Sequence, residues 1–445
     1  MRRTPWERGR LRHHEFTSAR MALAMRAMTT SFNEAAQADI HNQLEEDDDD
    51  IDVLDDEEYD CQHSLDTSLI PLATILANHQ RALGCGEIEL RGPRMMHVDE
   101  IGPRQFYELI NFTSEHFYTI VSLHSKLPNE LHSTISRHHC SKEMGLFLML
   151  LRWRNHTFAQ IEAIVNIRRN ICSDLYNTVI DILKDSDYVI LACNVDIARV
   201  QSSITHYQEG TEFAGATIAH KGMVCATDGK PMRSCRPTNI AAKKRGFSSK
   251  DDVQNLFYSG YIHCHGLRIS HTIWADGIAQ CAVGSIKDAD QKLLSRSELP
   301  DTLRYIGEKR ARVGEEELVV YGDPAYTSSK YVHRKHKGAI SKEEEQDNAC
   351  MIKPRSPAED TFKDLIVLFP FFDESDKLKH KILTHGRAKY KDELILCTLF
   401  YNLHTCCYSN QASSNYYVPP PTMEEYYERV NMVPCGVIAM AHETK

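Results

Sequence analysis

Three acidic residues occupy positions that suit the cleavage of phosphodiester bonds. Asp228 follows the apolar run 222–227, and Asp323 follows the run 318–322, so a strand is predicted to end at each aspartate. Cleavage assisted by two metal ions needs carboxylates from separate elements that converge on one point. Two aspartates at strand ends meet part of that requirement.

Glu359 supplies the third carboxylate, with thirty-five residues between it and Asp323. We predict a helix over residues 357–369, with Glu359 in its first turn. Its carboxylate is expected to point inward, because apolar residues follow at offsets of three, seven and ten: Phe362, Ile366 and Phe369. A buried carboxylate is costly unless it is paired or coordinates a metal. Arg355, four residues earlier, offers a salt bridge as the ordinary alternative.

The predicted catalytic and metal-binding residues are therefore Asp228, Asp323 and Glu359. Mg²⁺ prefers oxygen ligands and keeps several waters, so three acids suffice to hold it. The elements that must position them form a predicted mixed α/β domain over residues 221–410. Within it, the β-rich runs 265–273 and 278–283 flank Asp276-Gly277, a strong hairpin signal.

Residues 64–185, ahead of that domain, form a predicted all-α module. Apolar residues recur there at spacings of three and four, and Ser114 and Ser141 are candidate N-caps. Two apolar faces are expected to be buried in this module: Phe117, Ile120, Val121 and His124 in one helix, and Met144, Phe147, Leu148 and Leu151 in the next.

A helix-turn-helix is expected within this module. Thr157 and Gln160 have the form of a capping box, and a second helix is predicted from about Asn170 after a turn. The polar face of the second helix suits phosphate and base-edge contacts in a major groove. The alternative is an αα-hairpin with a solvated polar face. The predicted DNA-binding residues are Arg168, Arg169, Ser173 and Asn177.

The charge of the chain is unevenly distributed. Residues 45–60 carry twelve carboxylates, and without them the net charge of −10 becomes +2. We expect residues 1–63 to be a disordered basic arm followed by this acidic segment, which is either solvated or a regulatory tail that competes with phosphate. Residues 186–220 are expected to be a linker, and residues 411–445 a C-terminal tail.

Composition excludes several classes of protein. Apolar residues make up 42% and charged residues 26%, as in ordinary globular protein, and no apolar run reaches the roughly 18 residues that a membrane span needs. The fourteen cysteines include no Cys-x-x-Cys pair, which favours a reducing compartment. His138-His139-Cys140 and His263-Cys264-His265 lack a second pair at zinc spacing, so a structural role is favoured for both.

Three basic clusters suit contacts with phosphate, although each also fits an ordinary solvated loop. They are Lys243-Lys244-Arg245, Lys309-Arg310-Ala311-Arg312 and Arg334-Lys335-His336-Lys337. The first and third also have the composition of nuclear-import signals, and we predict a nuclear protein, with the cytoplasm as a second location.

Around the acids, the chain resembles the Harbinger group of DDE superfamily endonucleases and transposases, over residues 87–409. The first motif of that group resembles Gly222, Asp228-Gly229 and Pro237, and the second resembles Tyr258-Ser259-Gly260 with His265. Further elements in the same order are Gly284-Ser285-Ile286-Lys287-Asp288 with Ser297 and Leu299, Gly322-Asp323-Pro324-Ala325-Tyr326, and Arg355, Glu359, Phe362 and Leu365.

The resemblance implies an RNase H-like mixed sheet with flanking helices that gathers the three acids. It also implies two Mg²⁺ or Mn²⁺ ions, of which Asp228 would bridge both while Asp323 and Glu359 would each hold one. The expected substrate is double-stranded DNA, and a Myb-like DNA-binding protein is an implied partner. A homo-oligomer is compatible with these features. Asp288 is expected either to flank the site or to cap a helix.

Four residues, at three places in the chain, depart from the pattern of the group. Tyr261-Ile262 stands where basic residues are common before His265, Pro231 where a histidine is usual, and Lys363 where a glycine is frequent. These departures leave two other classes of function open. One is a domesticated, catalytically silent DNA- or chromatin-binding protein, and the other is a hydrolase of small phosphoesters.

Overall fold

The computed structural model describes residues 97–185, 188–195, 197–213, 222–236, 250–315, 317–338, 340–373 and 389–432. All of them belong to one compact unit, Arg91–Lys445. The arm and acidic segment expected over residues 1–63 lie outside the described residues, as do the start of the helical module and the cluster Lys243-Lys244-Arg245.

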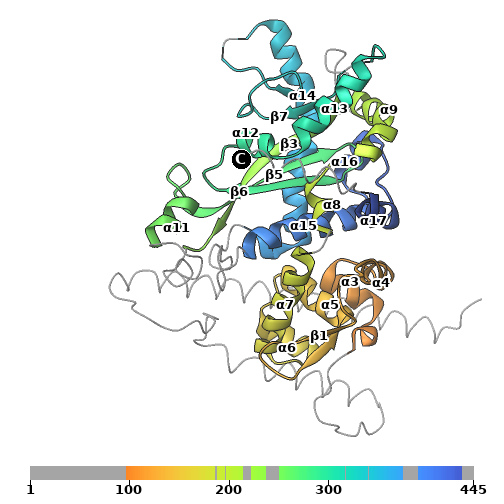
Figure 1. Cartoon of the computed structure of the whole chain (residues 1–445), viewed down its shortest axis with the longest axis vertical. Coiled ribbons are helices and arrows are strands. Elements are labelled where there is room, and N and C mark those ends of the chain that lie inside the picture. Colours follow the sequence, from red (N-terminus) through yellow and green to blue (C-terminus); the bar gives the residue numbers. More distant parts are fainter. Residues whose placement is uncertain are drawn as a thin grey trace, which may run out of the picture. The chain divides into compact units, whose positions relative to one another are not determined.

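The first part of this unit is mainly helical (Figure 1). Its elements are η1 (Val98–Glu100), α3 (Pro103–Ile110), α4 (Ser114–Leu123), β1 (Glu130–His132), β2 (His139–Ser141), α5 (Lys142–Trp153), α6 (Phe158–Val165) and α7 (Arg169–Lys184). Helix α5 is the centre of this part, because all its residues from Met144 to Leu151 are buried. The two apolar faces expected here are buried, His124 included.

A short hairpin corrects the expectation of a purely helical module. Strands β1 and β2 pair antiparallel, with Leu131 opposite Cys140 and both side chains buried. Three-residue strands are too short to produce a recognisable alternation in the sequence.

Helix caps follow the predicted pattern with small shifts. Ser141 caps α5 by accepting from the N–H of Met144 at 3.3 Å, and Thr157 forms the expected capping box with Gln160. Helix α4 is capped by Thr113, one residue before the predicted Ser114.

A six-stranded mixed sheet forms the second part, as expected for a mixed α/β domain. Its strands are β3 (Met223–Ser234), β4 (Tyr258–Ser259), β5 (Cys264–Trp274), β6 (Ala279–Ser285), β7 (Val319–Gly322) and β8 (Val332–Arg334). The order is β4-β5-β3-β7-β8, with β6 also paired to β5. Strand β3 pairs antiparallel with β5 and parallel with β7, so it is central. The predicted turn Asp276-Gly277 connects β5 to β6, with Gly277 at φ +83°.

Helices cover both faces of the sheet (Figure 1). On one face, His271 of β5 contacts Phe362 of α14 (Lys342–Leu368) and Thr398 of α15 (Lys389–Tyr408). On the other face, Trp274 meets Tyr207 of α9 (Ile197–Phe213). The remaining helices of the second part are α11 (Lys250–Phe257), α12 (Asp290–Arg296), α13 (Leu299–Ala311) and η3 (Pro370–Phe372).

The expected linker and C-terminal tail are helical where they are described. Residues 186–220 contain α8 (Tyr188–Cys193) and α9, and residues 411–445 contain α16 (Gln411–Tyr416) and α17 (Met423–Met432). The hydroxyl of Tyr426 in α17 donates to the carbonyl of Leu191 in α8 at 2.8 Å, and both residues are buried. Helices α8, α16 and α17 are short, so their stability comes from packing rather than from a pattern visible in the sequence.

Across the part of the chain that is described, no helix combines the length and the apolar composition that crossing a membrane requires.

Candidate functional site

Asp228 lies in the interior of β3, six residues before the strand ends, rather than at a strand end as predicted. Asp323 directly follows β7, as predicted. In the parallel pairing of β3 with β7, Ala226 lies opposite Tyr321. The pairing ends there, and each aspartate follows its last paired residue by two positions, with Asp228 still in β3 and Asp323 in the turn after β7.

A tight turn holds Asp323 in place. Its carboxylate accepts from the N–H of Ala325 at 2.7 Å, and its carbonyl accepts from the N–H of Tyr326 at 3.2 Å. The buried ring of Tyr326 packs against Gly322, where a Cβ would lie 2.6 Å from the ring. Glycine before Asp323 therefore permits the turn that fixes the carboxylate.

Glu359 departs from the prediction in two respects. Helix α14 begins at Lys342, capped by Ser341, so Glu359 lies in the helix interior rather than in a first turn at residue 357. Its side chain is 46% exposed and accepts a hydrogen bond from Arg355. The expectation that this carboxylate points inward is wrong, and the salt bridge is what the structure shows.

The physical reason is the position of the buried stripe of α14. The residues of the helix that face the core around Glu359 are Ala358, Thr361, Phe362 and Leu365. Glu359 lies at the edge of this stripe, where a long side chain reaches solvent.

His271 lies on the same face of the sheet as Asp228 and was not among the residues predicted from the sequence. It is the antiparallel partner of Asp228, so both side chains leave the same face. The His271 ring stacks on Phe362 with centroids 4.6 Å apart and an interplanar angle of 15°. Its Nε2 lies 3.0 Å from the hydroxyl of Thr398. This face of the sheet is therefore joined to α14, the helix that carries Glu359, through the stack with Phe362.

The pKa of Asp228 depends on its burial and on the charges around it. Burial raises the pKa of Asp228 to about 6, and the charges of Asp323 and Glu359 act in the same direction. The N–H of Gly229 and the guanidinium of Arg355 act in the opposite direction. Asp228 is therefore a half-buried carboxyl that is influenced by both predicted partners.

The residue types at this site fit a hard divalent cation, because all three offer carboxylate oxygens. The side-chain positions fit less well. Among the described residues, no group of three or more His, Cys, Asp or Glu side chains is placed to hold a metal ion. Glu359 is paired with Arg355, so binding of a cation by all three acids requires Glu359 to leave Arg355.

A further acid, Asp290 of α12, lies on the other face of the sheet and was missed by sequence reasoning. Its carboxylate pairs with Arg268 of β5, with Nη2 to Oδ2 at 2.9 Å. It lies so close to Gly229 that a Cβ there would be 1.9 Å from it. The glycine after Asp228 is therefore required by packing.

Asp288 does not cap α12, because the N-cap of that helix is Ala289 and no side chain accepts a hydrogen bond there. Its carboxylate accepts from the N–H of Ser285 at 3.0 Å and pairs with Lys292 and Arg296, at 2.6 and 3.1 Å. These contacts fix the turn that leads from β6 into α12.

The predicted DNA-binding residues fall into two groups. Arg168, the N-cap of α7, and Arg169 are exposed where the helix begins. Ser173 and Asn177 are half-buried, and Asn177 accepts a hydrogen bond from Lys389 of α15. The second helix begins at Arg169, one residue before the predicted start, after Asn166 ends α6 at φ 57°. The two arginines face solvent, whereas Asn177 contributes to packing between α7 and α15.

Two of the basic clusters are described, and both contain ion pairs. In the cluster at the end of α13, Arg310 pairs with Glu315 at 2.8 Å. In the cluster that starts in β8, His336 lies 3.0 Å from Asp347 and 3.4 Å from Glu344. Part of the positive charge of these two basic clusters is therefore compensated by neighbouring carboxylates.

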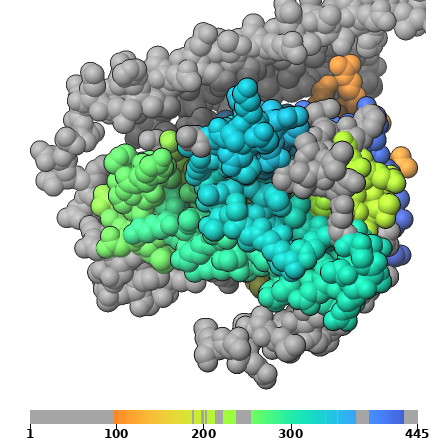
Figure 2. Space-filling view, turned by 90° about the horizontal axis from the view of Figure 1, so that it is seen from above, coloured from red at the N-terminus to blue at the C-terminus, as the bar shows by residue number. Residues whose placement is uncertain are grey.

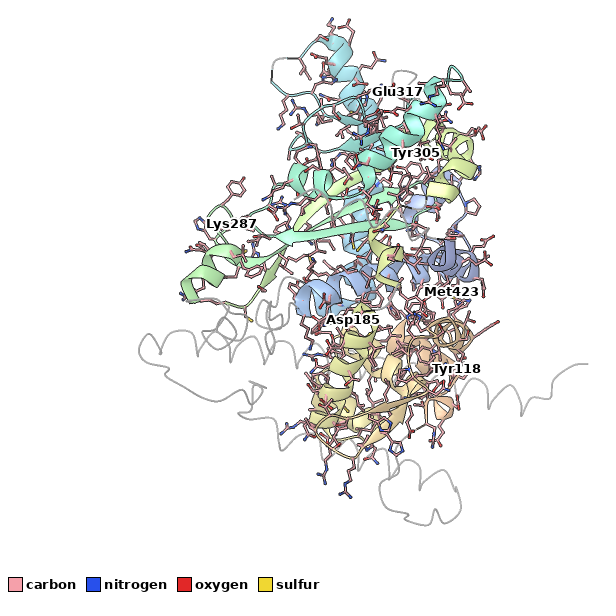
Figure 3. All side chains as sticks on the ribbon, in the orientation of Figure 1. Tyr118, Asp185, Lys287, Tyr305, Glu317 and Met423 are labelled. Carbon is pink, nitrogen blue, oxygen red and sulfur yellow. The ribbon has the colours of Figure 1, made fainter. Side chains whose placement is uncertain are left out.

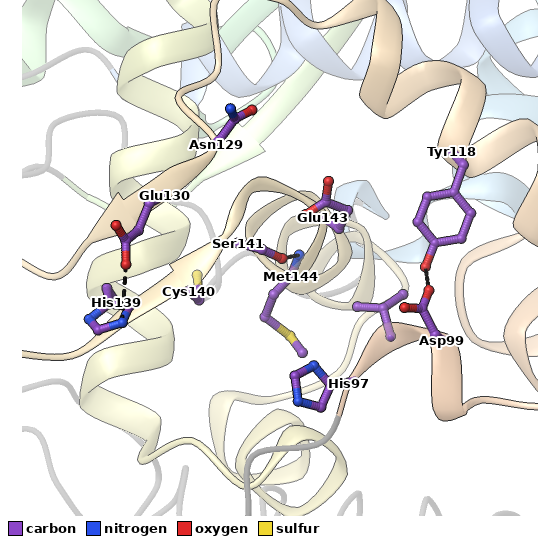
Figure 4. A pocket seen from close by; sticks show the side chains of 11 residues that line it. His97, Asp99, Tyr118, Asn129, Glu130, His139, Cys140, Ser141, Glu143 and Met144 are labelled. Atoms are coloured by element: carbon purple, nitrogen blue, oxygen red, sulfur yellow. Dashed lines mark hydrogen bonds and ion pairs between the residues drawn. The ribbon is translucent and has the colours of Figure 1, made fainter.

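Two cavities lie apart from the acids. One, of about 510 Å³, is in the helical part, and Figure 4 shows Glu130 bonded to His139 and Tyr118 bonded to Asp99 in its wall. The other, of about 420 Å³, lies between α9 and α13. Asp228, Asp323 and Glu359 line neither cavity.

Figure 2 views the side of the molecule on which the segment after α11 (green) and the start of α14 (blue) lie together on one surface.

Comparisons with known proteins add no identification. No family model matches the chain, and neither a curated protein nor a solved structure matches it.

Proposed function

We propose that this chain is a metal-dependent DNA endonuclease or transposase-like enzyme that uses Asp228, Asp323 and Glu359. The observation that supports the proposal is the parallel pairing of β3 with β7, because Asp228 and Asp323 each follow the paired residues Ala226 and Tyr321 by two positions. The charges of Asp323 and Glu359 both raise the pKa of Asp228. Acids from three separate elements that act on one another are what two-metal cleavage requires.

Each carboxylate has a distinct role in this proposal. Asp228 would lie between two Mg²⁺ or Mn²⁺ ions, and Asp323 and Glu359 would each hold one of them. Bound ions of this kind activate the attacking oxygen and stabilise the leaving one. Asp228 with a pKa of about 6 is mostly ionised at neutral pH, so it is available as a ligand. The turn around Asp323 keeps that carboxylate oriented before a cation arrives.

The DNA-binding part of the proposal rests on exposed cations. Arg168 and Arg169 at the start of α7 present charge for backbone phosphates, which gives affinity that depends on salt. We also propose that the sheet is RNase H-like and that α6 and α7 act as a helix-turn-helix. A Myb-like protein is the proposed partner, and the nucleus is the proposed location.

A second candidate function is a silent DNA- or chromatin-binding protein. The specific observation in its favour is the ion pair between Arg355 and Glu359. A cation supplied by the protein compensates this carboxylate without any metal.

Plasmid nicking in Mg²⁺ tests the two candidates. We expect Asp228→Ala and Glu359→Gln each to lower the nicking rate at least a hundredfold, because each removes a metal ligand. Asp301→Asn, an exposed acid of α13, and Asp360→Asn, the neighbour of Glu359, serve as matched controls and are expected to nick as the wild type does.

Equal nicking by the wild type and Asp228→Ala would show that this site does not catalyse cleavage. DNA binding without Mg²⁺-dependent nicking in the wild type would favour the silent protein. Hydrolysis of a chromogenic phosphate ester with no action on DNA would favour the small-phosphoester hydrolase.

A further inference from the structure

The connection between β4 and β5 presents an aromatic side chain to solvent. Tyr258 pairs with His265 and Ser259 with Cys264, so the hairpin is anchored in the sheet. Tyr261 at its tip is 93% exposed, the highest value among the large apolar side chains of the described residues. Burial of an aromatic ring is favourable, so a ring held in solvent at a fixed hairpin tip is suited to contact a ligand.

Two cations lie beside this hairpin. Arg236 lies two residues beyond the end of β3, where Ser234 pairs with His265. Burial lowers the pKa of His265, and the positive charge of Arg236 acts in the same direction.

Lys287 approaches from the end of β6. Ser285, two residues earlier, donates its hydroxyl to the carbonyl of Leu256 at 2.6 Å, two residues before Tyr258. The side chain of Ile286 lies against Gly266, next to His265. Lys287 itself is exposed, and Figure 3 places it at the same end of the sheet as α11.

We define the tip surface as Tyr258, Tyr261, His263, His265, Arg236 and Lys287. All of them are at least partly exposed, and none is an acid. Rings together with cations are the combination that binds single-stranded nucleic acid, because bases stack on the rings while the cations contact phosphates. A protein partner would instead favour an apolar centre within a polar rim.

The tip surface lies at a defined distance from the acids. Strand β3 leads from Asp228 to Ser234 over six residues, which corresponds to about 20 Å. That is about six base pairs of duplex. Lys230 lies on the same side of β3 as Asp228, along this path.

We propose that the tip surface binds an unpaired stretch of the DNA substrate about six nucleotides from the cut, with a base stacked on Tyr261. This inference rests on the proposed function for its substrate, since it places the stretch on the DNA whose backbone reaches the acids.

The test is the binding of fluorescent oligonucleotides to the full chain in Ca²⁺, in the Asp228→Asn background, so that no cleavage is needed. One probe is a blunt duplex, and the other is the same duplex with a six-nucleotide single-stranded tail. The Asp228→Asn protein is expected to prefer the tailed probe. Adding Tyr261→Ala is expected to lower affinity for the tailed probe about tenfold and to leave the blunt probe unchanged.

Three control variants separate stacking from other effects. Tyr261→Trp is expected to retain the preference, because stacking needs a ring, whereas Tyr261→Leu is expected to lose it. Tyr417→Ala removes another exposed tyrosine, the residue directly after α16, and is expected to change nothing. Arg236→Gln and Lys287→Gln are each expected to reduce the salt dependence of tailed-probe binding by about one phosphate contact.

The outcomes distinguish this inference from the nuclease proposal. Loss of tail preference with Tyr261→Ala, in a protein whose wild type fails to nick DNA, would support the tip surface and remove the nuclease. Unchanged binding of the tailed probe by Tyr261→Ala would overturn the tip surface even where nicking depends on Asp228. Equal losses with Tyr261→Ala and Tyr417→Ala would also overturn it.

Discussion

The imidazole of His271 lies flat against the ring of Phe362, with centroids 4.6 Å apart. This contact joins the strand that pairs with Asp228 to the helix that carries Glu359. We expect this aromatic stack in the core to influence where α14 holds Glu359.

Replacing the ring of Phe362 by an aliphatic side chain is expected to lower nicking activity more than it lowers the free energy of unfolding. Phe362→Leu keeps an apolar side chain in the core and should cost about 1–2 kcal/mol of unfolding free energy, but it removes the flat contact that positions α14. We expect nicking at saturating Mg²⁺ to fall about tenfold. Phe371→Leu, a buried aromatic of η3, is the matched control and should alter stability only. The same nicking rate in both variants would contradict a positioning role for Phe362.

The raised pKa of Asp228 predicts that this carboxylate destabilises the fold at neutral pH. The unfolded carboxyl ionises near pH 4, and the folded one near pH 6. The folded state binds the proton more tightly, so stability falls as pH rises from about 4 to about 6 and stays lower above that. Asp228→Asn should therefore raise the unfolding free energy at pH 7.5 by about 1–2 kcal/mol after allowance for solvent screening.

Urea denaturation at pH 7.5 and pH 4 measures this effect, and the gain should vanish at pH 4. Asp301→Asn, an exposed acid paired with Arg304, is the control and should show no such gain. A destabilised Asp228→Asn protein at pH 7.5 would mean that the carboxylate is compensated in the fold.

Metal affinity should depend on pH through the same group. A cation competes with the proton on Asp228, so apparent Mg²⁺ affinity should fall about tenfold per pH unit below pH 6 and level off above it. Calorimetric titration at pH 5, 6 and 7.5 provides the measurement. Affinity independent of pH across this range would exclude Asp228 as the ligand that titrates.

Gly229 is expected to tolerate no side chain. A Cβ there would lie 1.9 Å from the Asp290 carboxylate, which is held by Arg268, so Gly229→Ala should cost about 1–3 kcal/mol. Gly260→Ala is the matched control, because nothing lies within 4 Å of its Cβ position and its effect should stay within about 0.5 kcal/mol. Thermal or urea unfolding of both variants checks this, and similar stabilities would show that the Asp290 contact relaxes freely.

Local signals in the sequence determined much of this protein. The turn Asp276-Gly277, the capping box at Thr157 and the short strand before Asp323 all depend on neighbouring residues, and the structure confirms each of them. These features follow from backbone preferences and short-range hydrogen bonds, which a sequence displays directly.

Only the tertiary structure decided which residues the three acids meet. Asp228 lies inside β3 because pairing with β5 continues past the apolar run to Ser234. Glu359 turns to Arg355 because the buried stripe of α14 passes beside it, and Tyr261 stands exposed because the hairpin tip reaches beyond the sheet. These outcomes depend on contacts between segments far apart in the chain, where burial and neighbouring charge are set by packing and not by local sequence.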